Sequence, residues 1–82
     1  MEKIKFTFCI KISALKEAIL DKDKRSLEAL FPVLEYDINR FYSLLENNNL
    51  DESSIKRFNN LIKKVRMDLN ELGFSIDSLL KD

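Results

Sequence analysis

The apolar residues of this 82-residue chain change their spacing once, after the first twelve positions. Over residues 3–12 every second side chain is apolar, which is the period of an extended strand with one apolar and one polar face. On a helix the same positions would scatter around the axis. We therefore predict a strand over 3–12 whose other face is basic. Its apolar face consists of β-branched and aromatic residues, which favour sheets: Ile4, Phe6, Phe8, Ile10 and Ile12.

A single strand leaves the N–H and C=O groups on both of its edges without partners, which folded proteins seldom tolerate. It could pair with its copy in a second subunit, with the short segment 74–76, or with a strand of another protein. A two-fold antiparallel pairing satisfies both copies at once, so we predict a homodimer. The predicted dimerisation residues are Ile4, Phe6, Phe8 and Ile10.

After the strand, the spacing of three and four residues predicts helices. The first is expected over 14–31, with Ser13 as its N-cap, and the charged stretch 21–25 either interrupts it or forms its exposed part. The second is expected over 32–47. Pro32 either kinks a longer helix or stands in the first turn of this one. The apolar seam consists of Leu27, Leu30, Leu34, Ile38, Phe41 and Leu45.

The third predicted helix, over 52–72, has both of its ends marked. Asp51 is a good N-cap, and Gly73, the only glycine, stands where a left-handed C-cap residue is wanted. Asn47–Asn49 forms the preceding turn. A short helix over 75–81 is expected to end the chain.

Together these elements predict one domain over 1–82. Its class is mainly α with one N-terminal strand, built on an antiparallel hairpin of two long helices, with about three helices in all. A chain this short buries a modest core, which is a further reason to expect association with another subunit or protein.

Composition argues against an enzyme. Histidine is absent and cysteine occurs once, so His-based acid–base chemistry and His/Cys zinc sites are excluded. One glycine and one proline are too few for a phosphate-binding loop. Asp21 and Asp23 have the spacing of calcium ligands, but Ser26 stands where that loop needs glycine. We predict no catalytic residues, no cofactor and no metal site.

Charge and hydropathy point to a cytoplasmic protein. Fourteen basic and fourteen acidic residues cancel, and no apolar run approaches the roughly 18–20 residues that span a bilayer. The N-terminal alternation contains lysines and is followed by no small-residue cleavage site, so a secretory signal is not expected. We predict no membrane partner.

Three surface features are candidates for binding. A basic patch on the third helix is either a site for nucleic acid or an acidic partner, or a solvated face. Val33, Tyr36 and Tyr42 could extend an apolar patch for a partner helix. Asp37 and Arg40 are expected to form an exposed ion pair. The basic patch consists of Lys56, Arg57, Lys63, Lys64 and Arg66.

The sequence therefore favours a small non-enzymatic protein-interaction module that is homodimeric and docks on a larger protein. It would act as an adaptor, an export-type chaperone or an inhibitor. The alternative is a nucleic-acid-binding regulator or antitoxin. A strand followed by two helices, dimerising through the strand, resembles the ribbon-helix-helix repressors, in which the polar strand face enters the major groove. That resemblance implies a base-reading role for Lys3, Lys5 and Thr7, and no family is assigned on it.

Overall fold

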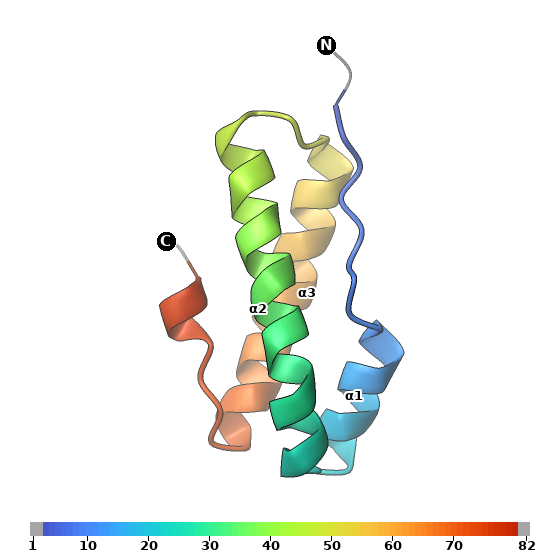
Figure 1. Cartoon of the computed structure of the whole chain (residues 1–82), viewed down its shortest axis with the longest axis vertical. Coiled ribbons are helices and arrows are strands. Elements are labelled where there is room, and N and C mark those ends of the chain that lie inside the picture. Colours follow the sequence, from blue (N-terminus) through green and yellow to red (C-terminus); the bar gives the residue numbers. More distant parts are fainter. Residues whose placement is uncertain (1–2, 81–82) are drawn as a thin grey trace.

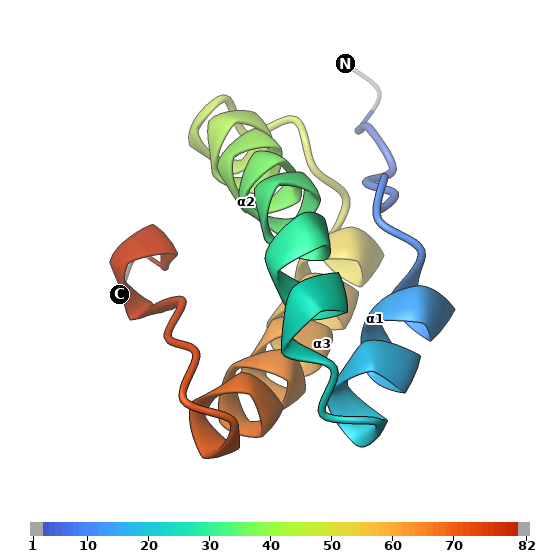
Figure 2. The same cartoon turned by 60° about the horizontal axis from the view of Figure 1, so that its bottom comes forward.

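The computed structural model describes residues 3–80, and this part of the chain is mainly helical, as predicted. Its elements are α1 (Ile12–Leu20), α2 (Lys24–Glu46), α3 (Glu52–Glu71) and a short 3-10 helix, η1 (Asp77–Leu79). Figure 1 shows α2 and α3 as an antiparallel pair. The N-terminal segment and α1 lie on one flank of that pair and the C-terminal segment lies on the other, an arrangement that the turned view in Figure 2 repeats.

Side-chain caps explain where the two long helices begin. The carboxylate of Asp23 accepts hydrogen bonds from the backbone N–H of Ser26 at 3.2 Å and from its hydroxyl at 2.8 Å. The carboxylate of Asp51 accepts from the backbone N–H of Ser54 at 2.7 Å, as the sequence predicted for the third helix. These bonds satisfy donors that a helix N-terminus otherwise leaves free.

The end of α3 is closed by Gly73. Its φ of +87° lies in the left-handed region that favours glycine. The N–H of Phe74 donates to the carbonyl of Leu69 at 2.9 Å, and the N–H of Gly73 donates to that of Asn70 at 3.1 Å. This pair of bonds is a Schellman motif, and the left-handed C-cap predicted at Gly73 is present.

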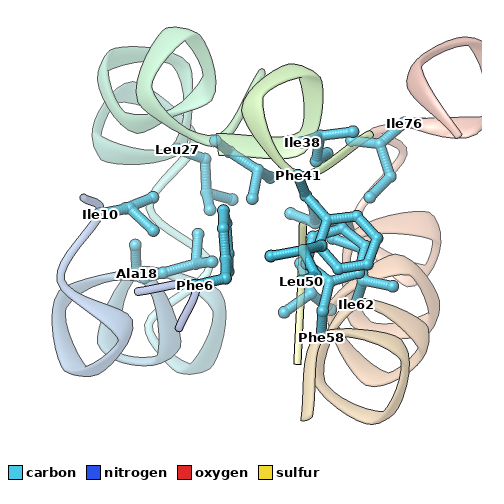
Figure 3. Packing of buried hydrophobic residues seen from close by; sticks show 14 residues of the cluster. Phe6, Ile10, Ala18, Leu27, Ile38, Phe41, Leu50, Phe58, Ile62 and Ile76 are labelled. Carbon is cyan, nitrogen blue, oxygen red and sulfur yellow. The ribbon is translucent and has the colours of Figure 1, made fainter. Parts of the chain in front are cut away.

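The core is organised around aromatic rings from three parts of the chain. The rings of Phe41 on α2 and Phe58 on α3 stack with centroids 3.6 Å apart and planes 8° from parallel. Phe6 meets both rings edge-on, at 5.5 and 5.9 Å. Figure 3 shows Phe6 between this stack and the aliphatic residues Ile10 and Ala18. The N-terminal segment is therefore part of the core of a single chain.

The strand predicted over 3–12 is not present. Residues 3–11 (the N-terminal segment) are extended, but the described chain contains no sheet, and the segment forms one isolated bridge, between Ile4 and Leu50. The alternation nevertheless has a physical basis, because an extended chain lying on helices also buries every second side chain. Phe6 and Ile10 are buried here, whereas Lys5 and Thr7 are exposed.

The helix boundaries near the middle of the chain differ from the prediction. The first helix begins at Ile12, with Lys11 rather than Ser13 as its N-cap, and it ends at Leu20, where the charged stretch 21–25 does interrupt the pattern. The boundary predicted between residues 31 and 32 is wrong, because α2 passes through Pro32 without ending. Pro32 and Glu28 are both exposed, so the carbonyl that loses its helical donor lies on the water-facing side of α2.

The C-terminal segment (73–80) returns along α2. The predicted helix over 75–81 is reduced to the single 3-10 turn η1, and residue 81 lies outside the described residues. Ile76 is fully buried, and Arg66 of α3 forms an ion pair with Asp77 at 2.5 Å. Phe74, Leu79 and Leu80 are partly buried against the core as well, so apolar packing and one exposed ion pair hold this segment.

Candidate functional site

The N-terminal segment is held by a buried carboxylate on α2. Asp37 is 0% exposed. Its carboxylate accepts a hydrogen bond from the backbone N–H of Cys9 at 3.0 Å and another from that of Ile10 at 3.0 Å. These two donors lie just before the N-terminus of α1, and the dipole of that helix favours a negative charge there. The Asp37–Arg40 ion pair, which was predicted to be exposed, is therefore half buried. Its carboxylate lies inside and binds the backbone of the N-terminal segment.

Arg40 completes this attachment from the outer side. Its Nη2 atom lies 3.3 Å from Asp37 and also donates a hydrogen bond to the carbonyl of Thr7. Its guanidinium stands over the ring of Phe6, 4.6 Å from the centroid, and 5.8 Å from the centroid of Tyr36. A cation over an aromatic face is attracted to the ring electrons. One arginine thus contacts both the backbone and a core side chain of the N-terminal segment.

A serine on α3 binds the same segment from the other helix. The backbone N–H of Phe6 donates to the hydroxyl oxygen of Ser54 at 2.9 Å, in a buried position. Nearby, the N–H of Asp51 donates to the carbonyl of Ile4 at 3.2 Å, and Ile4 donates to Asn49. Hydrogen bonds from the hydroxyl and the backbone N–H of Ser54 hold the pKa of Asp51 below its ordinary value.

These bonds remove the reason for pairing the segment with a second subunit. Phe6 and Ile10, two of the predicted dimerisation residues, are buried in the core of one chain. Phe8 is half buried and stacks on Phe58 with centroids 5.9 Å apart, and Ile4 is the one that stays exposed. Three of the backbone N–H groups that were expected to need another strand, those of Phe6, Cys9 and Ile10, donate to Ser54 and Asp37 instead.

The predicted partner-binding residues on α2 do not form one patch. Tyr42 is half buried, and its ring contacts Phe41 and Phe58 with centroids 5.5 and 6.1 Å away. Val33 is also partly buried against the core. Tyr36 is 57% exposed and lies near the Arg40 guanidinium. Of the three, only Tyr36 presents a largely free side chain.

The predicted basic patch is exposed and has few acidic neighbours on α3. No acidic residue stands between Glu52 and Asp68 on α3, and all five predicted basic residues face solvent. Arg66 is engaged with Asp77. The other four form what we call the basic face of α3. Its members are Lys56, Arg57, Lys63 and Lys64.

A hollow that the sequence did not predict lies beside this face, between α1 and α3. Its volume is about 320 Å³. Leu20 at its edge is 79% exposed, the highest value among the large apolar residues of the described chain. Figures 1 and 2 show α1 and α3 running in the same direction here. We call this hollow the α1–α3 groove, and it is lined by Lys16, Ile19, Leu20, Leu61, Lys64, Val65 and Asp68.

One signal in the sequence pointed toward the groove. Leu61 lies beside the apolar residues of α3 that are buried in the core, Phe58, Ile62, Val65 and Leu69, so it widens the apolar face of that helix. Lys64 follows it by one turn and belonged to the predicted patch. Leu20 carried no distinctive pattern, because it stands at the edge of a charged stretch.

Other kinds of site find no support in the part of the chain described. Within residues 3–80, no three Cys, Asp or Glu side chains gather so as to hold a metal ion. None of the helices in the same range has the length and apolar content to cross a bilayer. No protein family, curated protein or solved structure matches this chain.

Proposed function

We propose that this protein is a small non-enzymatic interaction module that docks a larger protein on the α1–α3 groove. The supporting observation is Leu20, a large apolar side chain left 79% exposed at the edge of an apolar hollow. Exposing leucine costs free energy, which a partner that covers it recovers. The self-pairing of the N-terminal segment is not part of the proposal, since that segment is bonded within its own chain.

The test compares two exposed apolar residues, one at the groove and one away from it. Leu20→Asp places a charge at the groove edge, whereas Met67→Asp does so at a residue of α3 that is 60% exposed and does not line the groove. Each tagged variant is used to capture proteins from the native host, and circular dichroism checks that both fold. We expect one captured protein to be retained by the wild type and by Met67→Asp and lost by Leu20→Asp. Capture that Leu20→Asp leaves unchanged would contradict the proposal.

Nucleic-acid binding is the second candidate function, and the basic face of α3 favours it. Four exposed cations on one helix, with no acid among them, suit a phosphate backbone. The ribbon-helix-helix version is not retained, because the N-terminal segment is not a strand and Lys3 donates to the carbonyl of Asn48 at 2.6 Å. Retardation of duplex DNA that weakens as salt rises and disappears in Lys56→Glu/Lys63→Glu would establish this function. An unshifted duplex at low salt would dismiss it.

A further inference from the structure

The chemistry of the α1–α3 groove shows what kind of partner it fits. Its floor is apolar, formed by Ile19, Leu61 and Val65, and its rim carries the amino groups of Lys16 and Lys64. Neither lysine has an ion pair within residues 3–80. Glu17 is the nearest acid to Lys16 along the chain, but it lines a different hollow, beside α2. The rim therefore carries two exposed lysine charges, with Asp68 as the one acid in the lining, next to an apolar floor.

The dimensions of the groove limit the shape of its occupant. The shorter wall, α1, has nine residues and is about 13 Å long, which corresponds to between two and three helical turns. A helix of that length presents apolar residues at positions i, i+3 or i+4, and i+7 to such a groove. Helix walls on both sides have their backbone groups already paired, so a strand finds no free edge to join there.

A second copy of this chain does not suit the groove. In a two-fold pair of grooves, the single acid Asp68 of one copy would face the two lysines Lys16 and Lys64 of the other, which leaves a net excess of positive charge. The large exposed apolar residues of the described chain are also dispersed, with Leu20 alone among them at the groove. A stable dimer buries roughly 800 Å² on each partner, far more than one leucine and a short floor provide.

We infer, on the basis of the proposed function, that the groove receives an amphipathic helix of another protein whose apolar stripe is flanked by Asp or Glu. The carboxylates face Lys16 and Lys64, and the stripe covers Leu20 and Leu61. Asp68 is the single acid lining the groove, and it marks one end. Because α1 and α3 run in the same direction, that end is the one nearer Leu20. The acidic flank of the bound helix therefore lies toward the Lys16 end.

The experiment selects ligands instead of assuming one. The probe is a displayed library of 16-residue peptides with leucines fixed at helical spacing and all flanking positions randomised. It is selected on the wild type, on Leu20→Asp, and on the charge-reversed variant Lys16→Glu/Lys64→Glu. The matched control is Lys56→Glu/Lys63→Glu, which reverses two charges of the same helix surface outside the groove lining.

We expect peptides that require Leu20 to be enriched in Asp and Glu at their flanks. A representative peptide should bind at least about threefold more weakly to Lys16→Glu/Lys64→Glu, as two partly exposed ion pairs allow, and the control should bind it nearly as the wild type does. The charge-reversed variant should select Lys and Arg instead. Peptides that require Leu20 but show no acidic preference would overturn this inference and leave the proposed function standing.

Two other outcomes would also overturn it. If no selected peptide depends on Leu20, the groove does not receive a helix of this design. If duplex DNA is retarded by the wild type and by Leu20→Asp but not by Lys16→Glu/Lys64→Glu, the rim lysines serve phosphates. The proposed function itself has a separate test. It fails if Leu20→Asp captures the same host proteins as the wild type.

Discussion

The N-terminal and C-terminal segments of this protein lie on opposite flanks of the same helical pair but are held in different ways. The N-terminal segment (3–11) donates backbone hydrogen bonds to a fully buried carboxylate and to a buried hydroxyl. The C-terminal segment (73–80) has a fully buried isoleucine and an ion pair between half-exposed side chains. A buried polar contact is costly to break because its remaining partner stays unpaired, whereas an exposed ion pair is replaced by water.

Removing the carboxylate of Asp37 should have the largest effect. Asp37→Ala leaves the N–H groups of Cys9 and Ile10 and the charge of Arg40 without their acceptor. Breaking a buried charged contact costs about 3–5 kcal/mol of unfolding free energy. Urea denaturation measures it, with Glu35→Ala, an exposed acid on the same helix, as the control, which we expect to stay within about 0.5 kcal/mol. Equal effects of the two variants would show that the carboxylate does not hold the segment.

Removing the hydroxyl of Ser54 should have an intermediate effect. Ser54→Ala deprives the buried N–H of Phe6 of its acceptor, which costs about 1–3 kcal/mol. Ser53→Ala removes the same hydroxyl group from the neighbouring exposed serine, and it should leave the free energy of unfolding nearly unchanged. Thermal or urea unfolding of both variants gives the comparison. A loss in Ser53→Ala as large as that in Ser54→Ala would mean that helix propensity and not the Phe6 bond explains the change.

The ion pair of the C-terminal segment should matter least. Asp77→Asn removes the ion pair with Arg66. The side chain of Arg66 is 48% exposed and that of Asp77 is 53% exposed. Such pairs contribute below about 1 kcal/mol, and salt weakens them further. The unfolding free energies of the wild type and the variant should therefore converge as salt concentration rises. A loss comparable to that of Asp37→Ala would erase the contrast between the two flanks.

The sequence predicted what depends on residues close together along the chain. Asp51 and Gly73 marked the ends of α3 because a cap bonds to residues within one turn. The alternation over 3–12 was interpreted as a strand, which is wrong, although residues 3–11 are extended and bury Phe6 and Ile10. Its acceptors were missed because Asp37 is 28 positions from Cys9 and, three residues before Arg40, has the spacing of an ordinary surface pair.

The groove could not be predicted for a related reason. Leu20 and Leu61 become neighbours through the path of the N-terminal segment, which places α1 beside α3. The predicted strand was expected to pair with a second subunit, and such a pairing would not have placed α1 beside α3. Because the hydrogen-bond partners of the N-terminal segment were predicted in a second subunit, neither its attachment to α2 and α3 nor the α1–α3 groove could be predicted.

Acid should weaken the hydrogen bond of the Phe6 amide before that of the Phe74 amide. The hydroxyl and the backbone N–H of Ser54 donate to Asp51, and these two bonds lower the pKa of Asp51 below 3.8. The same hydroxyl oxygen accepts from the N–H of Phe6. A carboxyl whose pKa is lowered by folding stabilises the folded state above its ordinary pKa, and this stabilisation is lost as pH falls through the lowered value. The Phe74 N–H, bonded to the carbonyl of Leu69, has no titrating partner.

Hydrogen exchange between pH 6 and pH 3, corrected for the intrinsic rate at each pH, follows both amides in one sample. The protection of the Phe6 amide should fall below pH 3.8 relative to that of Phe74, and the difference should shrink in Asp51→Ser, which keeps a capping oxygen that does not titrate. Parallel loss at both amides would instead indicate that acid acts on the whole fold, because a local effect of Asp51 can reach Phe6 through Ser54 but has no hydrogen-bonded route to Phe74.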